Sequence, residues 1–297
     1  MKRIVALTIV LLSALISMAQ QDSFPLPEVP CRLTTPAERA NYLALHYWDH
    51  YDFTDNTLIG NQDVSEQGFS NYISIMSGVT QQREAFDRLA GKITRNDKML
   101  NYFLDLADQY LAESHSPLYD EELYIIMLNS ILSVQHLDAT KRIQVQYNLD
   151  MAMKNRIGEV AADITMLLRD GTYTTLSSIK SNQYILLYMG NPDCNVCNFA
   201  KNQLLASAII THLVSCGDLA IISLCIEGCT QAWQDIPAPG GWIDACDENQ
   251  AIYEEEIYDI AQVPSFYLLD HDRKVILRDV HVEYLLQYLS SHKNVFP

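Results

Sequence analysis

The sequence predicts a protein of two domains, an all-α domain over residues 35–155 followed by an α/β domain over residues 156–297. Up to about residue 155, apolar side chains recur with the period of a helix. Beyond it, short apolar runs that resemble strands alternate with helical segments, a pattern typical of a central mixed sheet flanked by helices. A chain of 297 residues is long enough for two domains of ordinary size.

The N-terminus has the pattern of a secretory signal peptide. Lys2 and Arg3 precede the apolar run 4–16, and the small residues Ser17 and Ala19 occupy the positions that a signal peptidase recognises. We predict a signal peptide over residues 1–19, cleaved after Ala19; a retained membrane anchor is the alternative. No second long apolar segment follows, so the mature protein is expected to be soluble and secreted.

The net charge argues against two classes of partner. It is −17 at pH 7, and removal of residues 1–19 takes away Lys2 and Arg3 but no acid, which leaves −19. A surface this acidic repels nucleic acids and anionic membranes.

The all-α domain follows a linker, residues 20–34, that contains the proline-rich stretch 24–30 and is expected to be extended. Thr35 and Glu38, with Pro36 between them, form a capping box that predicts the start of a helix. Further on, Met99, Phe103, Leu106 and Tyr110 fall on one helical face. About six helices are expected before residue 155.

In the α/β domain, Asp170-Gly171 predicts a hairpin turn. The predicted strands after it are 172–176, 184–189, 219–226, 266–269 and 275–277. The predicted helices are 194–210, 230–234, 249–258 and 280–291.

Cys194 and Cys197 stand directly after a predicted buried strand and at the start of a predicted helix. The first amides of a helix lack internal partners and carry partial positive charge, which stabilises a thiolate placed there. Cys194 would then attack a substrate disulfide, and Cys197 would resolve the mixed disulfide.

This context resembles the thioredoxin-like superfamily, in particular secreted thiol-disulfide oxidoreductases of the TlpA and ResA type. The resemblance covers residues 155–297 and rests on 157–164, on 170–180, on the Cys194–Cys197 motif and on 263–270. It implies a thioredoxin-like fold for the C-terminal domain, a cis bond before Pro264, and substrate binding by Val263 and Pro264. No organic cofactor and no metal are implied.

Two departures from the family pattern affect the expected chemistry. Asp193 replaces a common tryptophan and places a carboxylate beside the Cys194 thiolate, which disfavours the thiolate. Tyr188 stands where many thioredoxins bury an acid that accepts protons from the second cysteine, so proton transfer at Cys197 requires water or another group.

The N-terminal half, through residues 24–30, 40–43 and 46–49, resembles an uncharacterised domain that precedes thioredoxin-like domains in secreted proteins of Bacteroides-type bacteria. Together the two resemblances imply a periplasmic thiol-disulfide oxidoreductase. Its partners would be thiols and disulfides of secreted or periplasmic proteins, with a membrane electron donor as a further candidate. The alternatives are a non-catalytic binding module on a thioredoxin scaffold and a peroxidase of the peroxiredoxin kind.

The other cysteines and a histidine pair leave further alternatives open. Cys225 and Cys229 could complete a zinc site with the first pair or form a second redox pair, but one buried and one loop thiol is the simpler expectation. Cys216 and Cys246 are expected in the core, and Cys31 is the candidate free thiol. His46 and His50 have metal-ligand spacing, although their aromatic neighbours more often indicate a packing face.

Overall fold

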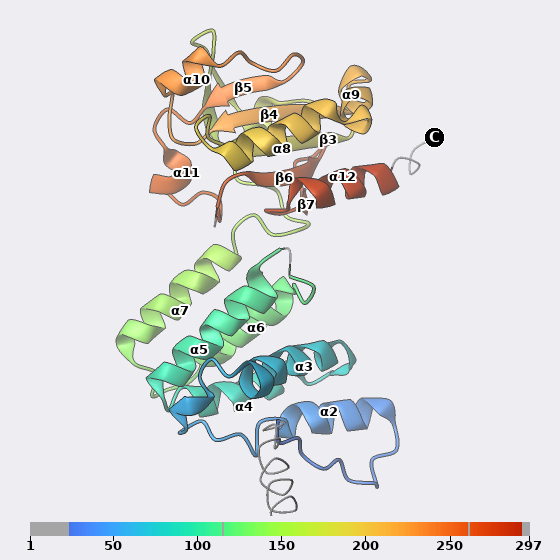
Figure 1. Ribbon diagram of the computed structural model, residues 1–297, viewed down its shortest axis with the longest axis vertical. Helices are drawn as coiled ribbons and strands as arrows, with labels where there is room; N and C mark the ends of the chain where they lie inside the picture. The colour runs from blue at the N-terminus through green and yellow to red at the C-terminus, as the bar shows by residue number, and fades with distance from the viewer. Residues whose placement is uncertain (1–23, 115, 261, 293–297) are drawn as a thin grey trace, which may run out of the picture. The chain divides into compact units, whose positions relative to one another are not determined.

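The first part of the chain is helical, as the computed structural model shows (Figure 1). The structure describes residues 24–114, 116–260 and 262–292, so the predicted signal peptide lies outside the described residues. The α-helices are α2 (Pro36–His46), α3 (Gln67–Ile75), α4 (Gln82–Ile93), α5 (Asp97–Ala107), α6 (Glu121–Leu132) and α7 (Ala139–Ala152). The described chain forms two compact units, divided inside α7 between residues 145 and 146.

The predicted capping box starts α2. Thr35 is the N-cap, its hydroxyl accepts a hydrogen bond from the Glu38 amide at 3.2 Å, and the Glu38 carboxylate accepts one from the Thr35 amide at 3.1 Å. Two backbone donors at the helix end are therefore satisfied by side chains.

Aromatic rings form much of the core of the helical unit. Trp48 packs edge-on against Tyr72 and Phe103, with ring centroids 5.5 and 5.2 Å apart. Phe24, from the predicted linker, stacks on Tyr47 at 4.7 Å. The described part of the linker, residues 24–34, forms no helix or strand, and its Phe24 ring completes this aromatic cluster above Gly68, where a Cβ atom would lie 2.4 Å from the ring.

The second unit is built on a seven-stranded mixed sheet with the order β2-β1-β5-β4-β3-β6-β7. The strands are β1 (Thr165–Leu168), β2 (Tyr173–Thr175), β3 (Tyr184–Gly190), β4 (Leu219–Cys225), β5 (Ile243–Cys246), β6 (Ser265–Asp270) and β7 (Val275–Leu277). β3, β4 and β5 are parallel, and the remaining pairs are antiparallel. The expected fold class, an all-α part followed by an α/β part with a central mixed sheet, is confirmed.

Helices cover the sheet on both faces. α8 (Asn195–Ala206), α9 (Ala208–Ser215) and α12 (Val282–Ser291) pack on the face that carries Leu186 and Tyr188 (Figure 1). The opposite face carries Ile185, Leu187 and Met189 in a second core with residues of the segment around α11 (Ala251–Glu254). Burial on both faces explains why β3 is a continuous apolar run in the sequence.

Two predicted helices differ in the structure. The helix predicted over 194–210 is two helices, α8 and α9, separated by Ser207 in an extended conformation. α8 buries Cys197, Ala200 and Leu204, and the next position in that phase after Ala208 would be the polar Thr211. The break turns the chain so that Ile209, Ile210 and Leu213 face the core instead.

Strand β5 is absent from the prediction because Asp244 interrupts a very short apolar run. The helix predicted over 249–258 shrinks to α11, since Gln250 and Glu256 adopt left-handed conformations with φ of 53° and 49° at its two ends. The turn at Glu256 directs the chain so that Tyr258 is buried in the core.

Candidate active site

Cys194 stands at the N-terminus of α8, where β3 delivers it after the short loop 191–193. It is the N-cap residue, with φ −85° and ψ 112°, and its sulfur accepts a hydrogen bond from the Cys197 amide at 3.0 Å. A sulfur in this position receives both a backbone donor and the positive end of the helix dipole. The predicted thiolate site is therefore present in the backbone geometry.

Cys194 and Cys197 form a disulfide, with Cα atoms 5.2 Å apart. Cys197 is 0% exposed, whereas Cys194 is half-buried and flanked by the exposed side chains of Val196 and Phe199. A protein partner can therefore reach only the sulfur of Cys194, and Cys197 stands behind it.

The bond between Val263 and Pro264 is cis, which confirms the expected conformation. Val263 packs against the same core cluster as Cys194 and Cys197. The roles of Val263 and Pro264 in substrate binding stay predictions.

Tyr188 is almost fully buried behind the disulfide. Its hydroxyl donates a hydrogen bond to the Cys197 carbonyl at 3.0 Å, and its ring stacks on Phe266 at 5.2 Å. The ring crosses Gly190, where a Cβ atom would lie 2.9 Å from the hydroxyl. Burial raises the pKa of Tyr188 far above its usual value, so the hydroxyl stays protonated and acts as a donor.

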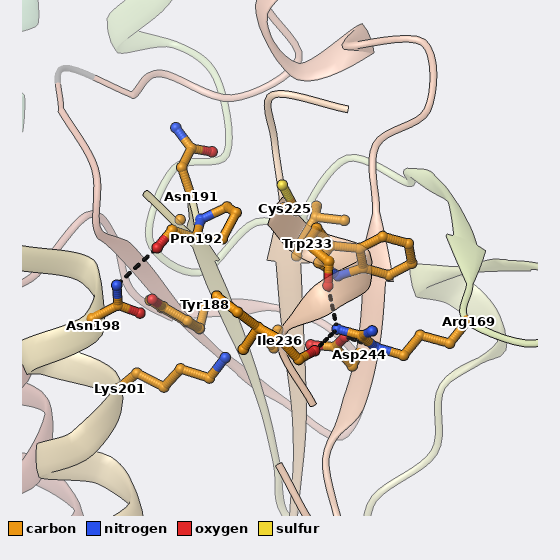
Figure 2. Close-up of a pocket in the computed structure, with 13 residues that line it drawn as sticks. Arg169, Tyr188, Asn191, Pro192, Asn198, Lys201, Cys225, Trp233, Ile236 and Asp244 are labelled. Atoms are coloured by element: carbon orange, nitrogen blue, oxygen red, sulfur yellow. Dashed lines mark hydrogen bonds and ion pairs between the residues drawn. The ribbon is translucent and has the colours of Figure 1, made fainter. Parts of the chain in front are cut away.

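A polar cavity of about 30 Å³ lies beside Tyr188 (Figure 2). The Arg169 Nε donates to the Asp244 carboxylate at 2.5 Å, and the Arg169 guanidinium lies 4.5 Å above the Trp233 ring. Arg169 also donates to the carbonyls of Trp233 and Ile236, at 2.7 and 2.6 Å. Asn198 donates to the Pro192 carbonyl at 2.8 Å and so ties α8 to the loop before Cys194.

The sequence predictions missed the charged residues of this cavity. Arg169 precedes the hairpin turn, Asp244 lies in the unrecognised strand β5, and Lys201 is one of several lysines on predicted helices. The four-residue spacing of Cys197 and Lys201 on a predicted helix was the one available signal.

A second disulfide joins Cys229 to Cys246, with Cα atoms 5.2 Å apart. The expectation of a free loop thiol at Cys229 was wrong. Cys246 lies in the core as expected, 0% exposed, and its sulfur is bonded to Cys229. The loop after β4 reaches the end of β5 because the two strands are parallel neighbours. Cys225 is buried as expected, and Cys31 is free and exposed.

Cys216 is exposed, which contradicts the prediction that it lies in the core. It is the C-cap residue of α9, one position beyond the end of that helix.

Within the ranges that the structure describes, no three His, Cys, Asp or Glu side chains are grouped to hold a metal ion. His46 binds the Asp49 carboxylate at 2.7 Å, and Lys92 binds the same carboxylate at 3.0 Å.

The three free thiols are expected to differ sharply in alkylation. Burial raises the pKa of Cys225, so its thiol is both protonated and covered, whereas Cys31 and Cys216 are exposed. Under native conditions near neutral pH, iodoacetamide should modify Cys31 and Cys216 first and reach Cys225 only after a denaturant is added. Digestion after Asp218 and Glu227 separates Cys216, Cys225 and Cys229 for mass spectrometry. Equal native rates at Cys225 and Cys216 would contradict the buried placement.

The fold and the site define a class of protein: α/β proteins with a disulfide at a helix N-terminus and a cis-proline in the same unit. A thioredoxin-like protein from Bacteroides caccae has a similar structure, with 30% sequence identity, a TM-score of 0.76, and coverage of 91% of this chain and 99% of that chain. The chain belongs to the thioredoxin-like proteins.

Other comparisons cover one half of the chain each. Residues 8–155 match a domain of unknown function, DUF5106. The C-terminal domain of an uncharacterized protein from Bacteroides fragilis is 28% identical, covers 46% of this chain and 98% of its own, and has a TM-score of 0.44. A domain of a possible thiol-disulfide isomerase from Cytophaga hutchinsonii is 23% identical over 48% of this chain and 98% of its own, with a TM-score of 0.39. The comparison with curated proteins gave no match.

Proposed function

We propose that the protein exchanges thiols and disulfides with other proteins through Cys194 and Cys197. The observation that carries the proposal is the asymmetry of the pair: Cys194 is accessible at a helix N-terminus, and Cys197 is fully buried directly behind it. One sulfur meets the substrate and the other is reserved for the second step.

In the reduced protein, the Cys194 thiolate attacks a substrate disulfide. A bond forms between Cys194 Sγ and one substrate sulfur, and the other substrate sulfur leaves as a thiolate. Cys197 then loses its proton and attacks Cys194 Sγ, which releases the second substrate thiol and oxidises the pair. Val263 and Pro264 would hold the substrate strand by backbone hydrogen bonds.

The periplasm is the proposed location, and it rests on the signal peptide predicted over residues 1–19. Secreted and periplasmic proteins with thiols or disulfides are the proposed substrates, and a dithiol such as a membrane electron donor would regenerate the reduced pair. Among the described residues, no helix has both the length and the apolar character needed to cross a membrane.

The reduction potential of the pair tests this function. We expect a reversible transition at roughly −120 to −270 mV, the range of working oxidoreductases. Trypsin cleavage after Lys180 and Lys201 yields one peptide with Cys194 and Cys197 and no other cysteine, so differential alkylation and mass spectrometry follow this pair alone. A pair that stays oxidised below about −300 mV would instead indicate a structural disulfide and favour a binding module.

A further inference from the structure

Lys201 lies one helical turn after Cys197 on α8, and residues four positions apart share a helix face. The two side chains therefore occupy neighbouring positions on the surface of α8. Figure 2 shows Lys201 extending from α8 toward the sheet, where it lines the polar cavity with Tyr188 and Asp244. A half-buried lysine in this place is unusual, because this face of α8 otherwise packs in the core.

The cavity of about 30 Å³ has space for a water molecule, which needs roughly 10–15 Å³ and two to four polar partners. Groups from four strands or their ends face Lys201 here: Tyr188 on β3, Ser223 and Cys225 on β4, Asp244 on β5, and Arg169 after β1. A water in this space can hydrogen-bond to Lys201 and to these neighbours.

Lys201 forms no hydrogen bond and no ion pair with any residue that the structure describes. The one carboxylate in the cavity, Asp244, is held by Arg169 at 2.5 Å. Burial lowers the pKa of Lys201, the charge of Asp244 opposes this effect, and the charge of Arg169 adds to it. The amine therefore exchanges its proton more readily than an exposed lysine.

Cys197 must lose a proton in the second step of exchange, although it is 0% exposed. Tyr188 does not meet this need, because its hydroxyl is a protonated donor already bound to the Cys197 carbonyl. We propose, on the basis of the proposed function, that Lys201 is the proton carrier for Cys197 and acts through water in the cavity that Lys201 lines with Tyr188, the residue bound to the Cys197 carbonyl.

The step balances. The neutral Lys201 amine takes the Cys197 proton through the water while Cys197 Sγ bonds to Cys194 Sγ and the bond from Cys194 to the substrate sulfur breaks. The substrate leaves as a thiolate and takes a proton from solvent. In the opposite direction, the Lys201 ammonium returns the proton to Cys197 as the pair is reduced.

The experiment follows both steps separately with 5,5′-dithiobis(2-nitrobenzoate), in a background where the exposed Cys31 and Cys216 are replaced by serine. The first release of the coloured thiolate reports attack by Cys194, and the second reports attack by Cys197 on the mixed disulfide. We compare Lys201→Gln, which cannot accept the proton, with Lys201→Arg, which keeps the charge but does not deprotonate. Lys180→Gln, at an exposed lysine, is the matched control.

We expect both Lys201 variants to slow the second release about tenfold or more near neutral pH, since positioned proton transfer contributes roughly 10²–10⁴-fold in enzymes. The difference in the rate of the second release between these variants and the parent protein should become smaller at high pH, where solvent removes the Cys197 proton directly. The first release should stay unchanged in every variant, and Lys180→Gln should match the parent protein.

Three results would overturn the proposal: an unchanged second release in Lys201→Gln, a normal rate in Lys201→Arg, which would indicate a role for charge alone, or equal slowing of both releases. If the parent protein itself gives no second release, the proposed function fails instead. The two failures are therefore distinguishable in one experiment.

Discussion

Replacing Cys197 by Ser is expected to stop exchange at the mixed disulfide and leave the substrate covalently bound to Cys194. The serine hydroxyl cannot displace a sulfur at neutral pH, and Cys197 is the buried partner of Cys194 in the disulfide. Non-reducing electrophoresis of periplasmic extract treated with the reduced variant should reveal adducts that dithiothreitol releases. Mass spectrometry of the tryptic peptide should then locate the attached partner at Cys194.

The double replacement of Cys194 and Cys197 by Ser is the matched control and should give no adduct. A second control, Cys216→Ser in the Cys197→Ser background, removes an exposed thiol that lies outside the site, so the adducts should persist. Adducts that depend on Cys216, or an absence of adducts from the Cys197→Ser variant, would count against exchange through Cys194 and favour the binding-module alternative.

Phe103→Ala is expected to destabilise the helical unit by about 3–5 kcal/mol, the cost of truncating a buried aromatic side chain. Phe103 is 0% exposed and contacts Trp48 at 5.2 Å, Phe53 at 5.7 Å and Phe69 at 5.9 Å, so its loss leaves a cavity at the centre of the aromatic cluster. Urea denaturation followed by circular dichroism measures the change in the free energy of unfolding.

Ile143→Ala is the control for this prediction, because Ile143 is 72% exposed and its truncation should alter the free energy of unfolding by no more than about 0.5 kcal/mol. Similar losses in the two variants would contradict the central position assigned to Phe103. The comparison uses two apolar side chains of the same unit that differ in burial.

The sequence predicted elements well where local signals and packing agree. The capping box at Thr35 and the apolar run of β3 each have one explanation in physical terms. β5 and the break at Ser207 were missed because tertiary packing decides them: Asp244 is tolerated in a strand through its bond to Arg169, which the sequence does not reveal.

In the candidate site, too, the residues that are close in sequence could be predicted, and those that only the fold brings together could not. Cys194 and Cys197 are close in sequence and stand between a predicted buried strand and a predicted helix, so their geometry could be predicted. Arg169, Lys201 and Asp244 are far apart in sequence and meet only because β1, β5 and α8 bring them to one cavity. The Cys229–Cys246 pairing likewise depends on the parallel neighbours β4 and β5, and no rule of spacing predicts it.

The burial of Cys197 determines the order in which partner proteins can bind. Under the proposed function, an electron donor and an electron acceptor must both bind at Cys194, because only its sulfur is accessible. They cannot occupy it together, so each must leave before the other docks, and the protein stores two electrons between visits. The donor and the acceptor therefore compete for one surface. A high concentration of either partner lowers the rate at which the other reacts with Cys194.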